Sequence, residues 1–482
     1  MCFKTRFGIH WISLHDWSLC KLLFVAVWLV QPGAVFGDVV QPKRNVLFLI
    51  ADDMNQFLGC YGDPIAKTPN LDKLAARGVL FEKAYCSFPL CGPSRNSLLT
   101  GLYPNSTGIL ENAQIFRQTI PNQLSLPQAF RRHGWFAGRV GKLYHYGVPL
   151  AIGTDGHDDP ASWELEINPA GVDRLEEEPK IFSLKPGQFG ATLSWYASPK
   201  NDRYHTDAMI AADAEWVLER CAQRRDRPFF LAVGFFRPHT PFVAPKSPYF
   251  DQFPEADMPV LRVDQSALSM VPKAAIASLR KKEEDEMNDE TRRQVKQAYY
   301  ASVSFMDAQV GRVIDALDRL GLAADTTLVF TSDHGYHLGE HGLWQKRSLF
   351  EESARVPLLI VAPGGGRGTV VRTPVSHVDI YPTLMEIAGI EGPANLQGQS
   401  LVPALRDPEW RGRGWALTHV LRGSFSGYSL RTSRWRYTEW DGGHKGRELY
   451  DHGADPKESI NLAGDSAHRG VLDELALILK QA

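Results

Sequence analysis

The stretch NVLFLIADD, residues 45–53, indicates the fold class of this chain. Its apolar run predicts a buried strand, and Asp52 and Asp53 fall at the carboxyl end of that strand. Similar runs recur in GWFAGRVGKLYH (134–145), PFFLAVGFFRPHTPF (228–242), TTLVFTSDHGYHLGEHG (326–342) and VPLLIVAPGG (356–365). Because helical patterns separate these runs, the sequence predicts parallel strands joined by crossover helices. We therefore expect an α/β fold with a large, mixed, mostly parallel sheet flanked by helices.

One of the intervening helices is clear from its spacing, because apolar residues recur every three or four positions. These residues are Met306, Val310, Val313, Leu317 and Leu320. We expect the stripe to pack on the sheet, and Gly321 is placed to end the helix. The charged segment 279–294 is predicted to be a solvated helix or an insertion.

The length of 482 residues suits a large domain with a smaller companion. We predict that the large domain spans residues 38–410. Beyond it, YSLRTSRWRYTEW (428–440) alternates like an antiparallel strand, and VLDELALILKQA (471–482) is typical of a final helix. Residues 411–482 are therefore expected to form a small α+β subdomain with an antiparallel sheet.

Residues 1–37 are predicted to be a signal peptide that lies outside the fold. Basic residues precede the short apolar run LLFVAVWLV (22–30), and small residues lead to a cleavage site after Gly37. The run is too short to span a bilayer comfortably, although an uncleaved anchor is the alternative. We expect an exported protein, periplasmic or secreted (lysosomal in a eukaryote), with no stable membrane insertion once the leader is cleaved.

Charge and cysteine usage exclude several function classes. The formal net charge of −2 gives no general affinity for nucleic acid or for anionic membranes. Two of the six cysteines belong to the predicted leader, which leaves four in the mature chain. If Cys91 has a task of its own, the other three cannot all pair internally, so the chain is not a disulfide-stapled scaffold.

Carboxylates follow two of the predicted strands. Asp52 and Asp53 come after the first strand, and Asp333 ends a second predicted strand, in the run TTLVFTSDHGYHLGEHG, in the same way. Because ligands of open α/β sheets bind beyond the carboxyl ends of the strands, we expect the three side chains to meet there. Such a group suits a hard divalent cation, Ca²⁺ rather than Mg²⁺, since calcium accepts a more flexible geometry. The alternative is that these residues cap turns and helices.

Cys91 stands directly before Gly-Pro-Ser-Arg in CSFPLCGPSRNSLLTG, residues 86–101. Pro93 favours the first turn of a helix, which places Cys91 at the helix N-terminus, where an anion is favoured. Arg95 lies one turn into this helix and adds a permanent cation. An unmodified thiol at this position would have a lowered pKa and be a good nucleophile; the alternative is an inert buried cysteine.

Four further polar residues fall in loops that follow predicted strands: Lys142, His145, His239 and Lys346. A single residue of this kind is more often part of the polar surface. Together with the helix N-terminus and the carboxylates, the four indicate a pocket for a tetrahedral oxyanion, either sulfate or phosphate.

The motif CGPSR followed by NSLLTG resembles the signature of the sulfatase family of the alkaline-phosphatase superfamily. The resemblance covers nearly the whole mature chain and is closest to the iduronate-2-sulfatase branch. It is carried further by DDMNQFLGCYGD, TPNLDKLAARGVLFEKAYC, VGKLYH, PFFLAVGFFRPHTPF, QAYYASVSFMDAQVGRVIDALDRL, FTSDHGYHLGEHGLWQK and LRTSRWRYTEW. It implies an alkaline-phosphatase-like fold and an enzyme that hydrolyses sulfate esters of a sulfated carbohydrate.

The same resemblance implies roles for individual residues. In this family the signature cysteine, here Cys91, is oxidised to the aldehyde formylglycine by a formylglycine-generating enzyme. The resemblance also implies one bound Ca²⁺, with ligands at Asp52, Asp53, Asp333, His334 and the modified Cys91. It places around the aldehyde and the sulfate the side chains of Arg95, Lys142, His145, His239 and Lys346.

The chemistry implied by the resemblance begins with attack on sulfur by one hydroxyl of the hydrated aldehyde. Lys142, Lys346, Arg95 and the metal would stabilise charge on the sulfuryl oxygens. His239, with Lys346, would protonate the departing sugar oxygen. The second hydroxyl would then lose its proton to His145, and sulfate would be expelled.

Two alternatives keep the same pocket. One is a phosphate monoester or diester hydrolase of the same superfamily, because a tetrahedral anion site does not by itself separate sulfur from phosphorus. The other is a binder of sulfated glycans, not an enzyme, in which Cys91 is never matured.

Overall fold

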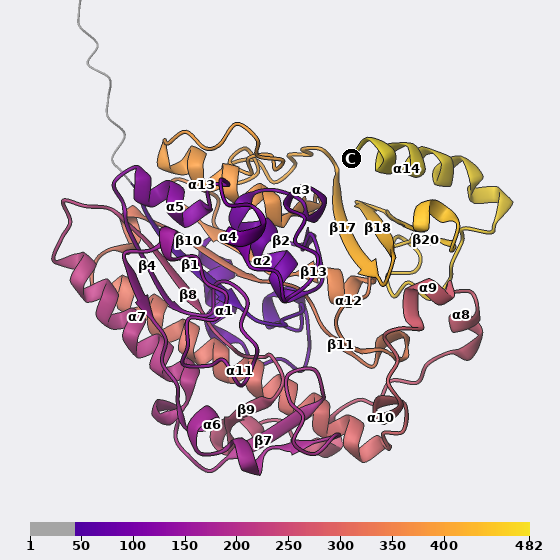
Figure 1. Ribbon diagram of the computed structural model, residues 1–482, viewed down its shortest axis with the longest axis horizontal. Helices are drawn as coiled ribbons and strands as arrows, with labels where there is room; N and C mark the ends of the chain where they lie inside the picture. The colour runs from indigo at the N-terminus through magenta and orange to yellow at the C-terminus, as the bar shows by residue number, and fades with distance from the viewer. Residues whose placement is uncertain (1–43) are drawn as a thin grey trace, which may run out of the picture. The chain divides into compact units, whose positions relative to one another are not determined.

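The structure is a computed structural model that describes residues 44–482, so the predicted signal peptide lies outside the described residues. Its largest sheet has eight strands in the order β15-β2-β14-β10-β1-β8-β4-β5 (Figure 1). The bounds of these strands are β1 Asn45–Ala51, β2 Val79–Phe81, β4 Phe136–Gly141, β5 Leu165–Ile167, β8 Phe229–Gly234, β10 Thr326–Ser332, β14 Leu358–Val361 and β15 Thr369–Val371.

The centre of this sheet is parallel, because β1 pairs in parallel with both β10 and β8, and β4 pairs in parallel with β8. The run at 356–365 differs from the expectation of a parallel strand, since β14 runs antiparallel to β10. The segment between them contains only one short α-helix, α12 (Glu351–Ala354), so no long crossover carries the chain back to the starting edge. The predicted class, an α/β fold with a mixed and mostly parallel sheet, is confirmed.

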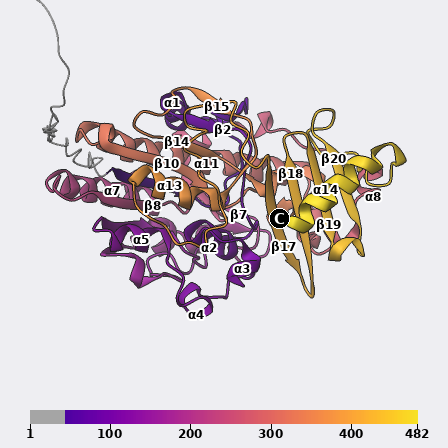
Figure 2. The ribbon, with the colours of Figure 1, turned by 90° about the horizontal axis from the view of Figure 1, so that it is seen from above.

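Strand β1 is buried on both faces. Leu47 and Leu49 belong to a core shared with α7 and α11, whereas Phe48 and Ile50 belong to a second core shared with α2, α5 and α13. The helix bounds are α2 Cys91–Thr100, α5 Leu126–Arg132, α7 Thr206–Ala222, α11 Asp289–Arg319 and α13 Ile380–Ala388. Figures 1 and 2 show the two sets of helices on opposite faces of the sheet. An unbroken apolar run is therefore what this central strand requires.

The helix predicted from the apolar stripe is α11, which is 31 residues long. Gly321 follows it with φ 64°, a left-handed conformation that suits a helix end. The helix begins at Asp289, inside the charged segment 279–294. The expectation that this whole segment is solvated is wrong at Glu284, which is 3% exposed and accepts a hydrogen bond from the Gln345 side chain.

The C-terminal part of the chain forms a separate antiparallel sheet in the order β17-β18-β19-β20, with α14 packed against it (Figure 2). The bounds are β17 Trp415–Arg422, β18 Phe425–Thr432, β19 Trp435–Trp440, β20 Arg447–Asp451 and α14 Arg469–Gln481. Leu430, Tyr437 and Leu449 of the sheet share a cluster with Leu472 and Leu475 of α14. The predicted small C-terminal subdomain is thus confirmed, and its boundary at residue 411 stays a prediction.

Two further observations concern the described part of the chain. Among residues 44–482, no helix combines the length and the apolar character needed to cross a bilayer. The cysteines in this range, Cys60, Cys86, Cys91 and Cys221, are all free, in agreement with a chain that has no disulfide framework.

Candidate active site

The ends of adjacent strands gather the acidic residues at one edge of the sheet. In the parallel pairing of β1 with β10, Ala51 lies opposite Ser332. Asp52 and Asp333 are the next residues of the two strands, so they emerge side by side. Strand β4 ends on the same side, and Lys142 follows it directly.

Helix α2 presents Cys91 to this edge. Cys91 is the first residue of the helix, Leu90 precedes it in an extended conformation, and Pro93 lies in the first turn. The thiol therefore stands where the free backbone N–H groups and the helix dipole attract negative charge. All residues of α2 are buried, so the helix holds the thiol on a rigid support.

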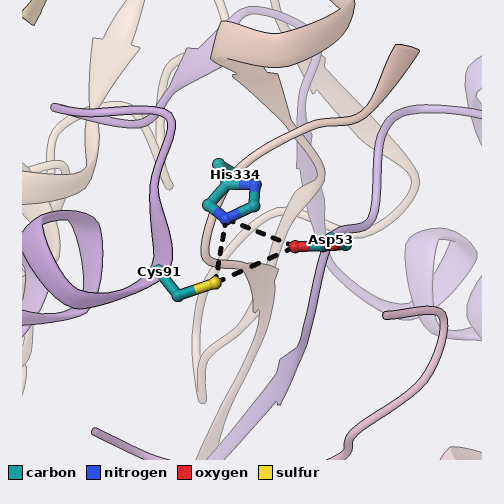
Figure 3. A group of neighbouring side chains, drawn as sticks. All are labelled: Asp53, Cys91 and His334. Carbon is teal, nitrogen blue, oxygen red and sulfur yellow. Dashed lines mark hydrogen bonds and ion pairs between the residues drawn. The ribbon is translucent and has the colours of Figure 1, made fainter. Parts of the chain in front are cut away.

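The side chains of Asp53, Cys91 and His334 point toward one another (Figure 3). His334 Nε2 lies 3.3 Å from Cys91 Sγ and 3.3 Å from Asp53 Oδ1. The same nitrogen lies 3.6 Å from Asp333 Oδ2. Asp52, Cys91 and Asp333 form a second converging group that shares the thiol with the first. The structure thus brings together all five residues expected to hold a metal ion.

This donor set fits a divalent cation. Asp52, Asp53, Asp333 and His334 are all 0% exposed. Asp53 Oδ2 is buried and has no hydrogen-bond partner, so one carboxylate oxygen is free to bind a cation. Carboxylate oxygens are the ligands that Ca²⁺ and Mg²⁺ take in proteins, and a buried carboxylate requires a positive partner.

Arg95 does not have the environment that was expected for a sulfate-binding group. Its Nε donates to Asp333 Oδ2 at 2.9 Å, and its Nη2 donates to Asp52 Oδ1 at 3.2 Å. The remaining donors bond to the carbonyl oxygens of Lys142, Leu143 and Ala51. Because all of its donors are used and its side chain is 0% exposed, Arg95 orients the carboxylates and has no donor left for a ligand.

Two lysines add positive charge to the site. Lys142 Nζ donates to Asp52 Oδ2 at 2.5 Å. Lys346 Nζ donates to Asp53 Oδ1 at 2.5 Å and lies 3.2 Å from Cys91 Sγ. Burial alone would raise the pKa of the Cys91 thiol, but the charges of Lys346 and Lys142 lower that pKa well below its usual value. The pocket therefore stabilises negative charge at the position of the Cys91 sulfur.

His239 is held in one tautomer. Its Nδ1 lies 2.5 Å from the Thr240 carbonyl oxygen, which can only accept, so Nδ1 carries the proton. The lone pair of Nε2 then faces Lys346 Nζ at 3.1 Å. His145 lines the same cavity, and burial lowers its pKa, which favours the neutral imidazole. Both histidines can thus exchange a proton with a ligand in the cavity.

The cavity in front of these residues has a volume of about 500 Å³, which is the size of a small-molecule site. His145, His239 and Lys346 line it, and Lys346 Nζ lies 3.2 Å from Cys91 Sγ. Arg347 and Arg422 also line it, and Arg422 comes from the C-terminal sheet.

Comparison with known proteins gives the family. The family model described as "Sulfatase" matches residues 44–390. The chain belongs to the sulfatase family. A second model, described as "N-sulphoglucosamine sulphohydrolase, C-terminal", matches residues 339–482 of this sulfatase. The predicted family and enzyme class are confirmed.

Individual relatives cover nearly the whole chain. A "Sulfatase" of Formosa agariphila is 32% identical over 459 aligned positions, covering 91% of this chain and 86% of the relative. The "Iduronate 2-sulfatase" of Mus musculus is 30% identical over 548 aligned positions, covering 94% of this chain and 97% of the relative. Among solved structures, the phosphonate monoester hydrolase of Agrobacterium radiobacter has a TM-score of 0.75 and 25% identity, with coverage of 91% and 95%.

Sequence reasoning missed two kinds of residue in the sulfatase site. Tyr299 belongs to α11, a helix that was assigned only to the core, yet its hydroxyl donates to the Asp53 carbonyl oxygen at 3.0 Å. The backbone N–H of Asn55 donates to the same hydroxyl at 3.1 Å. Arg422 lies at the end of β17, outside the motifs that carry the resemblance. A tyrosine within an apolar stripe, and an arginine before a turn, carry no signal that separates them from ordinary core and surface residues.

Proposed function

We propose that this protein is an exported sulfatase that hydrolyses sulfate esters of a sulfated carbohydrate, with formylglycine formed from Cys91 and one bound Ca²⁺. Residues 38–410 would form its catalytic domain, 411–482 its C-terminal subdomain, and 1–37 the cleaved signal peptide. The observation that carries the proposal is the convergence of Cys91 with buried carboxylates, with His334 and with Lys346, whose Nζ lies 3.2 Å from the sulfur.

Members of this family in general use a metal ion and formylglycine. Asp52, Asp53, Asp333 and His334, with residue 91, would hold the Ca²⁺, which polarises an ester oxygen as a Lewis acid. The aldehyde hydrate at position 91 would supply the nucleophile, which the cysteine itself can form only after oxidation by a maturing enzyme.

The chain's own charged residues would bind and orient the ester. The charges of Lys346 and Lys142 lower the pKa of Cys91, so both lysines would also stabilise charge on the sulfuryl oxygens. Arg95 would act as a positioning residue, because its hydrogen bonds fix Asp52 and Asp333. This replaces the direct contact with sulfate that the resemblance implied for Arg95.

Proton transfer would fall to the histidines. His239 Nε2 accepts from Lys346 Nζ at 3.1 Å, and this pair would deliver a proton to the departing sugar oxygen. His145 would take a proton from the group at position 91. The neutral form that this requires is favoured by burial, which lowers the pKa of His145.

The experiment starts with co-expression of the chain and a formylglycine-generating enzyme. Mass spectrometry of the tryptic peptide containing residue 91 should show the aldehyde, and 4-nitrophenyl sulfate should be turned over. The Cys91→Ala variant should be folded and inactive. Full turnover by that variant would remove the proposed chemistry, and binding of sulfated glycan without any turnover by the matured protein would favour the binder.

A second candidate is a hydrolase of phosphate or phosphonate esters. It is favoured by the structural likeness to a phosphonate monoester hydrolase, with a TM-score of 0.75 over 91% of this chain. The same cation-lined cavity would accept either tetrahedral anion. Parallel measurement of kcat/KM on 4-nitrophenyl sulfate, 4-nitrophenyl phosphate and a phenylphosphonate monoester separates the two functions.

A further inference from the structure

The active-site cavity extends beyond the groups that would bind one ester. Among the residues that line it, all within the described part of the chain, there is no aspartate or glutamate, although the whole sequence contains 55 acidic residues. Its basic residues include Arg347 and Arg422, for which the proposed reaction has no use. The cavity is therefore positive over more of its wall than a single sulfate group requires.

Arg422 is an unusual arginine because it is buried without a counter-ion. Its exposed fraction is 7%, and no carboxylate among residues 44–482 forms an ion pair with it. Its Nη2 donates to the Arg347 carbonyl oxygen, and its guanidinium lies over the Trp440 ring at 5.5 Å. Its Nε is buried and has no hydrogen-bond partner. A buried charge with an unused donor is costly unless a ligand completes its environment.

Arg347 stands next to the catalytic lysine and faces the same cavity. Its Nε also is buried without a partner. Its one ion pair is weak, since Nη2 lies 3.5 Å from Oε1 of Glu111, and both side chains are at least 40% exposed. Arg347 has φ 78°, a left-handed conformation that is unfavourable for a residue with a side chain. The backbone N–H of Arg347 donates to the Pro89 carbonyl oxygen at 3.1 Å, and its own carbonyl accepts from Arg422, so tertiary contacts hold this backbone against a local conformational cost.

The two arginines act on each other. Burial and the positive charge of Arg347 lower the pKa of Arg422 to about 10, so the pair repel each other across the cavity wall. An oxyanion bound at both guanidinium groups would offset this repulsion. A structural role alone explains the contacts of Arg422 with the Arg347 carbonyl and Trp440, but it leaves the Arg422 charge without a carboxylate partner among residues 44–482.

We propose that Arg347 and Arg422 form a second oxyanion subsite, which binds a carboxylate or a further sulfate of a polyanionic saccharide while the scissile sulfate lies at Cys91. This inference rests on the proposed sulfatase function and narrows its substrate class. A sulfated saccharide with one anionic group would use only half of the cavity. One with two groups would be held at both ends.

The test compares substrates in the matured enzyme. Arg422→Gln and Arg347→Gln should each lower the ratio of kcat/KM for a dianionic saccharide to kcat/KM for a monosulfated saccharide that has no second anionic group. The expected fall is roughly 10- to 100-fold and acts mainly through KM. Arg422→Lys, which keeps the charge, should restore part of the ratio. The control is Arg434→Gln, because Arg434 is 63% exposed and paired with Asp451, away from the cavity. Its ratio should equal that of the wild type.

Two dianionic substrates separate the sources of the second anion. One carries a uronate carboxylate beside one sulfate, and the other carries two sulfates and no carboxylate. The substrate whose ratio falls in Arg422→Gln identifies the group that the subsite binds. If kcat/KM falls equally on the monosulfated saccharide and on both dianionic saccharides, the arginines only support the fold, and the proposal is overturned.

A binding experiment keeps this inference separate from the proposed function. In the Cys91→Ala background, calorimetry should show that adding Arg422→Gln weakens binding of a disulfated disaccharide by roughly 10- to 100-fold. If this loss is seen while the matured wild type hydrolyses no sulfate ester, the subsite stands and the sulfatase proposal fails. If binding does not depend on Arg422, the subsite is refuted whatever the enzyme hydrolyses.

Discussion

Arg95 donates from Nε to Asp333 Oδ2 at 2.9 Å, and both side chains are completely buried. The same guanidinium reaches Asp52, so one side chain fixes the ends of two neighbouring strands. The geometry of the proposed metal site thus depends on a residue that does not itself bind the metal or the ester.

Replacement of Arg95 should therefore act through the metal. Arg95→Lys keeps the charge but loses the fork that spans two carboxylates, and we expect the affinity for Ca²⁺ to fall about 10- to 100-fold. Calcium titration of the activity measures this change. Arg77→Lys is the control, since Arg77 makes a forked contact with one carboxylate, that of Asp318, at the surface. Unaltered calcium affinity in Arg95→Lys would contradict the positioning role.

Removal of calcium should abolish activity and lower stability together. Treatment with a chelator is expected to inactivate the enzyme, and added Ca²⁺ should restore it. At a calcium concentration of 100 Kd, the folded state should gain about 2.7 kcal/mol over the metal-free protein. Thermal unfolding with and without Ca²⁺ measures this gain. In Asp53→Asn the gain should be much smaller; an equal gain would place the ion elsewhere.

The His239–Lys346 pair should matter most for poor leaving groups. We expect His239→Gln to lower kcat about 100-fold or more on a sugar sulfate, whose oxygen must be protonated as it departs. The loss on 4-nitrophenyl sulfate should be much smaller, because nitrophenolate leaves without a proton. Parallel kcat measurements on the two esters test this. Equal losses would show that His239 binds the sulfuryl group and does not protonate the leaving oxygen.

A buried carboxyl group in the C-terminal sheet predicts a pH dependence of stability. Burial raises the pKa of Glu448 from 4.5 to about 7, although Trp440 Nε1 and the Tyr450 hydroxyl each donate to it at 2.7 Å. A carboxyl group whose pKa is higher in the folded state stabilises that state below the unfolded pKa. This contribution is lost as pH rises from about 4.5 to about 7.

Glu448→Gln should therefore raise the free energy of unfolding at pH 8 by at most about 3 kcal/mol. Near pH 4.5 it should change this free energy little. A glutamine can still accept from Trp440 and donate to the Tyr450 hydroxyl. Denaturant titrations at both pH values measure the difference. Glu391→Gln, at an exposed position, is the control and should show no such change with pH.

The contact between β8 and the active-site loop leaves no room for a side chain at Gly234. A Cβ atom there would come 1.8 Å from the Lys142 carbonyl oxygen. Gly234→Ala should therefore displace Lys142 and greatly reduce both stability and activity. Gly470→Ala is the matched change, because Gly470 lies in α14 with nothing within 4 Å of the added carbon. It should stabilise the protein by about 0.5–1 kcal/mol.

Much of the fold follows from local patterns. The unbroken apolar run before Asp52 predicts a central strand because both of its faces meet a helical layer. Pro93 indicates the helix start at Cys91 because proline is favoured in a first turn. The direction of β14 could not be predicted, since apolar composition is the same for parallel and antiparallel neighbours.

Contacts between side chains that lie far apart in the sequence could not be predicted from local sequence patterns. Arg95 was expected to face the sulfate, yet its carboxylate partners lie 43 and 238 residues away, and only the assembled sheet brings them within reach. Glu284 was expected to be solvated for a similar reason, since its partner Gln345 is 61 residues distant. Charge content alone does not reveal which charged residue the tertiary fold will enclose.

The hairpin between β17 and β18 contributes Leu421, Arg422 and Gly423 to the cavity wall, while the proposed metal ligands follow strands of the larger sheet or, for Cys91, begin helix α2. Part of the proposed substrate selectivity therefore lies in a stretch of chain that contains no proposed metal ligand. Exchanging only this two-strand tip between relatives offers a route to retarget the enzyme to another glycan without rebuilding its reaction centre.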